Sequence, residues 1–137
     1  MGTENVDRET IEVLKLAGLA IIIATIANVI LYYIGASVDA FDDRVINPST
    51  DAELVVMDVI QASIMFLIIG TIAYFVVNRF TDNTKTNFRN LAGVGYILSL
   101  SNPLLIDSIR ASTYIFLITM HTVSAVIFIY LMIYKND

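Results

Sequence analysis

Residues 16–38 read LAGLAIIIATIANVILYYIGASV, and this run of 23 residues between Lys15 and Asp39 contains no charged side chain. A helix that crosses about 30 Å of hydrocarbon needs roughly 20 consecutive, mostly apolar residues. The run therefore predicts a membrane-spanning helix, and the segments that follow it in the chain repeat the same pattern.

Three more uncharged runs, with 20, 17 and 24 residues, lie at 59–78, 90–106 and 111–134. The first and last are long enough to span, and the middle one falls at the short end of the observed range of about 17–25 residues. We therefore predict an all-α membrane protein in which four transmembrane helices form an up-down-up-down bundle. The expected single membrane domain covers 1–137, with helices near 10–36, 52–79, 86–102 and 109–134 and an outer loop at 37–51.

The composition agrees with a membrane bundle. Hydrophobic residues make up 57% of the chain, charged residues only 15%, and the mean hydropathy is +0.75. These values leave too few polar positions to cover the surface of a soluble domain of this size. The sequence contains no cysteine, which excludes disulfides, thiolate metal sites and thiol redox chemistry.

Basic residues near the ends of the expected helices divide six to two between the two sides of the membrane. One side carries Arg8, Lys15, Arg79, Lys85, Arg89 and Lys135, and the other carries Arg44 and Arg110. Because short cytoplasmic loops hold the excess of Lys and Arg, this division predicts a multi-pass protein of the cell membrane with both termini in the cytoplasm. The expected partner of the helices is therefore the lipid bilayer. The basic residues are too few to form a positively charged surface that binds nucleic acid.

Small residues recur along the first expected helix. Ala20, Ala24 and Asn28 follow one another at four-residue spacing, which places them on one helix face. Small side chains let another helix approach closely, and this is how apolar helices associate in lipid. We expect this face to pack inside the bundle.

Two structures compete for the outer loop. The runs 44–46 and 54–56 would form a short hairpin around a turn at 47–49. Alternatively, Thr50 and Glu53 form a capping box that begins the second helix above the membrane surface. We favour the capped helix, because isolated two-strand hairpins are only marginally stable.

The third expected helix runs into Pro103. A proline inside a helix lacks an N–H donor and displaces the carbonyl four residues earlier, here that of Ser99. The helix should therefore kink or stop near Asn102. Irregular backbone near the outer membrane face must be buried in protein or wetted by a cavity.

His121 is the only ionisable side chain other than tyrosine that lies well inside an expected span. Such residues are costly in a membrane, and an imidazole there can bind a metal or haem, relay protons or bond a polar ligand. Asn28 and Ser99 are expected at similar depth, with Asn102 beside the helix break. We favour a polar layer that holds the helices together. The alternative is that these four residues form a ligand site, and they are our candidate ligand-binding residues.

No catalytic set and no metal site are predicted. Ser124 follows His121 by three residues, but no acid at mid-span orients the pair and no oxyanion donors are evident. A metal would find only methionine sulfur and neutral oxygens as further ligands. We therefore expect a protein that is not an enzyme, and the residues identify no cofactor.

The carboxy-terminal half contains three short motifs: Asn102-Pro103-Leu104, Ala111-Ser112-Thr113 and the run ITMHTVSA at 118–125. In these motifs the chain resembles an uncharacterised family of small prokaryotic four-helix integral membrane proteins, a domain of unknown function. In that family a proline after the third helix precedes a Met-His pair in the fourth. The similarity covers about residues 12–134, and Asn28 also fits it. The resemblance implies the architecture and no activity, cofactor or catalytic residue.

Two kinds of function follow. We favour a non-enzymatic accessory or structural subunit that packs against larger membrane proteins or against further copies of itself. The alternative is a bundle that binds a small ligand or cofactor, such as a lipid, haem or a metal, in a polar layer around His121. This alternative requires a cavity and a ring nitrogen of His121 that is not bonded to protein. A proton or ion pathway is the weakest hypothesis, because a relay needs successive ionisable or wetted groups.

Overall fold

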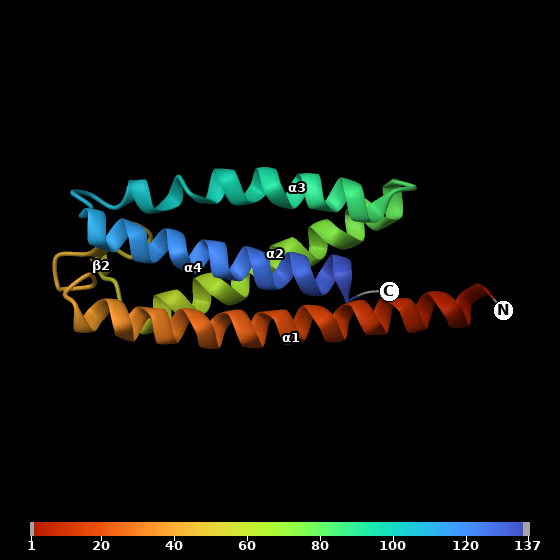
Figure 1. The fold of residues 1–137 in the computed structure, drawn as a ribbon, viewed down its shortest axis with the longest axis horizontal. Helices are drawn as coiled ribbons and strands as arrows, with labels where there is room; N and C mark the ends of the chain where they lie inside the picture. Colours follow the sequence, from red (N-terminus) through yellow and green to blue (C-terminus); the bar gives the residue numbers. More distant parts are fainter. Residues whose placement is uncertain (1, 136–137) are drawn as a thin grey trace.

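The computed structural model describes the backbone of residues 2–135 and the side chains of residues 8–135. Four helices follow one another in alternating directions, so α1 begins and α4 ends at the same end of the bundle, here termed the inner end (Figure 1). The opposite end, which holds a small hairpin, is the outer end. The elements are α1 Gly2–Ser37, β1 Ile46–Asn47, β2 Ala52–Glu53, α2 Val56–Phe80, α3 Thr84–Ser99, the 3-10 turn η1 Asn102–Leu105, α4 Ala111–Ile129 and the π-helical turn η2 Tyr130–Tyr134.

The prediction of an all-α bundle of four packed helices is confirmed. Three helical segments are long and apolar enough to cross a membrane, namely Arg8–Ser37, Val56–Phe80 and Ala111–Tyr134. The remaining helix, α3, has 16 residues, which correspond to about 24 Å at 1.5 Å per residue. The chain therefore has the helices of a multi-pass membrane protein, with one helix shorter than the others.

The α-helical part of α3 ends at Ser99, and the 3-10 turn η1 follows it. Pro103 lies within this turn and is buried. The break occurs where the missing N–H of Pro103 predicts it, because the proline cannot continue the hydrogen-bond pattern of an α-helix.

The preference for a capped helix in the outer loop was wrong, because the hairpin forms. Ile46 pairs with Glu53 and Asn47 with Ala52 in antiparallel register. The backbone N–H of Leu54 also donates to the carbonyl of Val45 at 2.8 Å. Thr50 and Glu53 therefore lie within the hairpin, and α2 begins only at Val56.

Burial explains why this two-strand hairpin forms. Val45 and Leu54 flank the strands and are only 5% and 9% exposed, in a cluster with Phe41 and Ile106. The hairpin is therefore not isolated, since it shares an apolar core with the outer ends of the helices. The turn is also fixed locally, because the side-chain oxygen of Asn47 accepts a 2.9 Å hydrogen bond from the N–H of Ser49.

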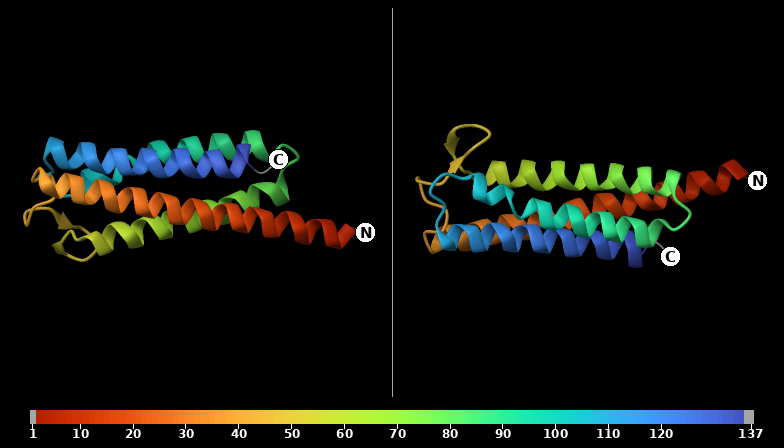
Figure 2. Two further views of the ribbon diagram at one scale, coloured as in Figure 1. Left: turned by 60° about the horizontal axis from the view of Figure 1, so that its bottom comes forward. Right: turned by 90° about the horizontal axis from the view of Figure 1, so that it is seen from above.

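The alanine face of α1 lies inside the bundle, as predicted. Ala20 and Ala24 are 0% exposed, and α1 packs along both α2 and α4. In contrast, α2 and α3 are close at the inner end and diverge toward the outer end, because α2 crosses obliquely toward α1 (Figure 1, Figure 2). An aromatic cluster fills the inner end, where Phe88 packs edge to face against Tyr74 and Phe128. The divergence of α2 from α3 leaves space in the middle of the bundle.

Candidate functional site

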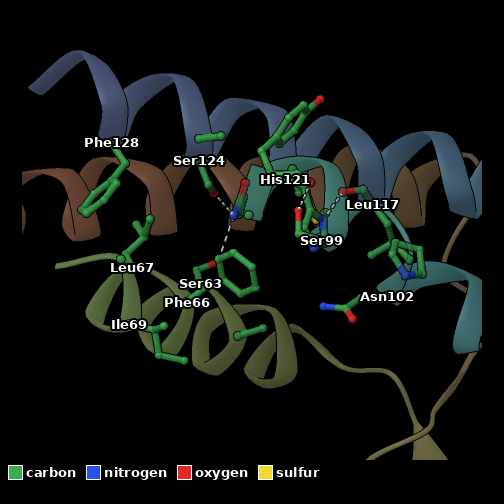
Figure 3. Close-up of a pocket in the computed structure, with 18 of the residues that line it drawn as sticks. Ser63, Phe66, Leu67, Ile69, Ser99, Asn102, Leu117, His121, Ser124 and Phe128 are labelled. Atoms are coloured by element: carbon green, nitrogen blue, oxygen red, sulfur yellow. Dashed lines mark hydrogen bonds between the residues drawn. The ribbon is translucent and has the colours of Figure 1, made fainter. Parts of the chain in front are cut away.

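A cleft of about 600 Å³ occupies the space between α2 and α3, with α4 and part of α1 as its floor (Figure 3). It extends from the hairpin turn at 47–49 and Asp58 at the outer end to Phe88 and Phe128 at the inner end. Its volume falls in the range of about 300–1,000 Å³ that is typical of small-molecule sites. The cleft is therefore the candidate site.

A polar node crosses the bundle at the middle of the cleft. The side-chain nitrogen Nδ2 of Asn28 donates 2.9 Å hydrogen bonds to Oγ of Ser63 and to Oγ of Ser124. Ser63 in turn donates to the carbonyl of Val59 at 2.7 Å. Asn28 is only 4% exposed, and its Oδ1 is buried without a hydrogen-bond partner in the described part of the chain. The node therefore ties α1 to α2 and α4 and leaves one sealed acceptor.

His121 projects from α4 at the same level (Figure 3). Its Nδ1 lies 2.7 Å from the carbonyl oxygen of Leu117, one helical turn earlier. Because a carbonyl oxygen can only accept, Nδ1 donates this bond, and in the tautomer that carries its single proton on Nδ1 the atom Nε2 presents a lone pair. Nε2 has no hydrogen-bond partner among the described residues. The rings of Phe66 and His121 form a T-shaped pair with 6.1 Å between their centroids. His121 thus offers a hydrogen-bond acceptor to the cleft.

A second polar connection joins α3 to α4. The hydroxyl of Tyr96 lies 2.7 Å from Oγ1 of Thr122. Thr122 donates its own proton to the carbonyl of Ile118 at 2.8 Å, so Tyr96 is the donor in this pair. Ser99, which is 4% exposed, donates to the carbonyl of Tyr96 at 2.6 Å. The hydroxyl protons on this wall of the cleft are therefore already used within the protein.

All four residues predicted for ligand binding line this one cleft: His121, Asn28, Ser99 and Asn102. The four residues differ in which polar atoms remain free to bond a ligand. The amide nitrogen of Asn28 and the hydroxyl of Ser99 are committed to protein partners, whereas Asn102 is exposed at the outer mouth. His121 is the member of the set whose open polar atom lies at mid-depth.

Two functional residues in the lining of the cleft, Ser63 and Asp58, were not predicted from the sequence. Ser63 is a polar residue within an apolar run, the same pattern that identified Asn28, so this pattern could have identified Ser63 as well. Asp58 marked only the end of that run in the sequence. In the structure its carboxylate accepts a 2.9 Å hydrogen bond from the N–H of Val55 at the start of α2, and the residue also lines the outer end of the cleft. Its second role depends on the position of the hairpin, which the sequence did not predict.

The ionisable residues that line the cleft are Asp58, Tyr96 and His121, and no Lys or Arg is among the described liners. Within residues 8–135, no three His, Cys, Asp or Glu side chains converge in a way that could hold a metal ion. A metal or haem iron in the cleft would therefore depend on His121 with neutral oxygens or the sulfur of Met120.

The arginines of the outer end are engaged elsewhere. Asp42 is bonded by Arg44 at 2.5 Å and by Arg110 at 3.1 Å, and Arg110 also donates to the backbone carbonyl of Asp39. The hydrogen bond from Arg44 is the main reason why the pKa of Asp42 is lowered, with a further contribution from the charge of Arg110. This cluster fastens the loop after α1 to the start of α4, outside the cleft.

Residues 9–137 match the family described as a family of unknown function, DUF6069, and the chain belongs to that family. No curated protein matches the chain. No solved structure matches it either.

Proposed function

We propose that this member of the DUF6069 family is a four-span protein of the cell membrane whose bundle binds a small amphiphilic molecule in the cleft between α2 and α3. The cleft itself carries the proposal. It has the volume of a ligand site, it is lined mainly by apolar side chains, and it contains an unpartnered imidazole nitrogen at mid-depth. Sites for small molecules combine an apolar wall with a few well-placed polar groups in this way.

Outward-facing side chains support the placement in lipid. Ile22, Ile72 and Ile115 lie on α1, α2 and α4, and each is more than half exposed. In the proposed topology α3, together with η1, completes the fourth crossing, because residues 90–106 contain no charge. Both termini then lie in the cytoplasm, on the side that carries six of the eight basic residues.

Two glycines of α3 allow a matched test. A Cβ added to Gly93 or to Gly95 would meet nothing within 4 Å, so a side chain at either position starts in open space. Gly95 lines the cleft, whereas Gly93 does not. The Gly95→Leu variant should therefore place a side chain in the cleft, while Gly93→Leu makes the same change in helix propensity outside it.

The experiment measures the small molecules that the purified full-length protein retains in a mild detergent, by mass spectrometry after denaturation. We expect Gly95→Leu to lose the retained molecule by about tenfold or more, the change that 1.4 kcal/mol gives, and Gly93→Leu to keep it. Equal retention by Gly95→Leu and the unchanged protein would overturn the proposal.

The accessory or structural subunit is the second candidate. Its support is that Gly18 and Gly93 have open space around them, and small residues of this kind let a helix of another protein or of a second copy approach closely. On this hypothesis Gly18→Leu and Gly93→Leu should release proteins that co-purify with the chain. Gly95→Leu should leave such a complex intact, so the same set of variants separates the two functions.

A further inference from the structure

The polar and apolar liners of the cleft are separated along its length. Toward the inner end from His121, the lining begins with the bonded pair of Asn28 and Ser124 and continues with apolar residues, among them Leu67, Ala73, Leu91, Phe88 and Phe128. At the level of His121 and toward the outer end, the polar residues of the lining include Ser99, Asn102, Asp58 and Ser49. His121 and Phe128 are seven residues apart on α4, so this mainly apolar part extends over about 10 Å.

This separation determines the orientation in which an amphiphilic molecule binds in the cleft. An apolar tail is accommodated between His121 and Phe128, and a polar head lies at or above the level of His121, toward the hairpin. The opposite orientation would place the head against the aromatic cluster at the inner end, where it would lose its hydrogen bonds to water without replacement.

Several donors near His121 are already used within the protein. Ser99, Ser63 and Tyr96 donate their hydroxyl protons to protein oxygens, and the amide of Asn28 donates to two serines. Nε2 of His121 accepts, because the proton of the ring is held by the bond from Nδ1 to Leu117. A head that can only accept would require His121 either to move its proton away from that bond or to take up a second proton.

The charges around the cleft also disfavour a head group that is an anion. No Lys or Arg is among the described residues that line the cleft, and Asp58 contributes a carboxylate at the outer end. The nearby guanidinium groups of Arg44 and Arg110 are paired with Asp42 instead. An anionic head would thus find no permanently charged counter-ion in the cleft and could pair only with a His121 that had taken up a second proton, which makes it costlier to bury than a neutral donor.

We infer that the cleft selects an amphiphile whose head donates hydrogen bonds and carries no negative charge, with the donor on Nε2 of His121 and the tail directed toward Phe128. This inference rests on the proposed function, because it names the class of molecule that the cleft holds. Alcohols and protonated amines share the required chemistry.

The test uses three probes with the same chain: dodecanol, dodecylamine and dodecanoate. The full-length protein is measured in lipid nanodiscs at about pH 8, where the carboxylate is ionised, the amine is protonated and a free imidazole is neutral. Because the chain has one histidine, ¹⁵N labelling of histidine reports on His121 alone. Binding of a donor to Nε2 should move the Nε2 resonance, and the titration gives the affinity of each probe.

We expect dodecanol and dodecylamine to bind at least about tenfold more tightly than dodecanoate and to shift the Nε2 resonance. The Asp58→Asn variant should weaken dodecylamine and leave dodecanol unchanged, which separates the cationic from the neutral head. If dodecanoate binds as tightly as dodecanol, the inference fails although a binding cleft remains. If no probe binds and Gly95→Leu also retains the native molecule, both the inference and the proposed function fail.

Discussion

Nδ2 of Asn28 in α1 donates a 2.9 Å hydrogen bond to Oγ of Ser124 in α4, which lies 96 residues later in the chain. The same nitrogen donates to Ser63 in α2, so one amide connects three helices at mid-depth. The fourth helix is attached separately, through the bond between Tyr96 and Thr122. The hydrogen bonds of Asn28 hold α2 against α1 and α4 but do not reach α3. The cleft therefore lies between α2 and α3, the two helices that these bonds do not connect.

The first prediction concerns this node. Replacing Asn28 with leucine removes both cross-helix hydrogen bonds, and each such bond is worth about 0.6–2 kcal/mol in a membrane bundle. We expect Asn28→Leu to lower the free energy of unfolding by about 1–3 kcal/mol, measured by titrating mixed micelles with a denaturing detergent.

Thr119→Val provides the control for this change. Thr119 is partly exposed on α4, and its hydroxyl donates only to the carbonyl of Ile115 in its own helix, at 2.8 Å. This substitution should alter the free energy of unfolding by less than about 0.5 kcal/mol. A loss at Thr119 as large as that at Asn28 would mean that the node does not hold the helices together.

The second prediction separates the hairpin from the capped helix. Leu54 is 9% exposed in the outer cluster, so truncating it leaves a void beneath the hairpin. We expect Leu54→Ala to cost about 2–3 kcal/mol in the free energy of unfolding. Thr50→Ala should change it by less than about 0.5 kcal/mol, because Thr50 caps no helix. The reverse order of the two effects would restore the capping box.

The hairpin also shows what the sequence could and could not predict. Uncharged runs predict α1, α2 and α4 because membrane-spanning length is a local property, and Pro103 predicts the end of α3 for the same reason. The hairpin depends on burial of Leu54 against Phe41 and Ile106, which are distant from it in sequence. Local propensity therefore favoured the wrong alternative.

The candidate site divides in the same way. His121 and Asn28 could be predicted, because a polar residue inside an apolar run is conspicuous in a sequence. The cleft could not, since it results from the oblique course of α2 past α3. The roles of the residues depend on partners that only the fold brings together, as when Leu117 orients the ring of His121.

The third prediction concerns the close contact of α2 with α4. A Cβ at Gly70 would lie 2.8 Å from Cε1 of Phe128, and that ring is held in place by Phe88. We expect Gly70→Ala to destabilise the bundle by about 1–3 kcal/mol, because a buried ring must move. Gly93→Ala, which meets no atom within 4 Å, should leave the stability unchanged or raise it slightly. The result is checked by the denaturing-detergent titration, and an equal response of both variants would contradict the contact.

The last prediction concerns acid. Hydrogen bonding from Arg44 lowers the pKa of Asp42 below the ordinary aspartate value of 3.8. A carboxyl whose pKa is lowered by folding contributes stability that is complete above the ordinary value and is lost as the pH falls through the folded value. The ion pair between Asp42 in the loop after α1 and Arg110 should therefore hold at neutral pH and weaken below about pH 3.8.

Hydrogen exchange of the backbone at 39–45 should rise in that range for the unchanged protein. The Asp42→Asn variant should already show the faster exchange at neutral pH, and Asp82→Asn, at the opposite end of the bundle, should behave like the unchanged protein. Slow exchange in Asp42→Asn at neutral pH would show that the buried side chains of the loop hold it without the ion pairs.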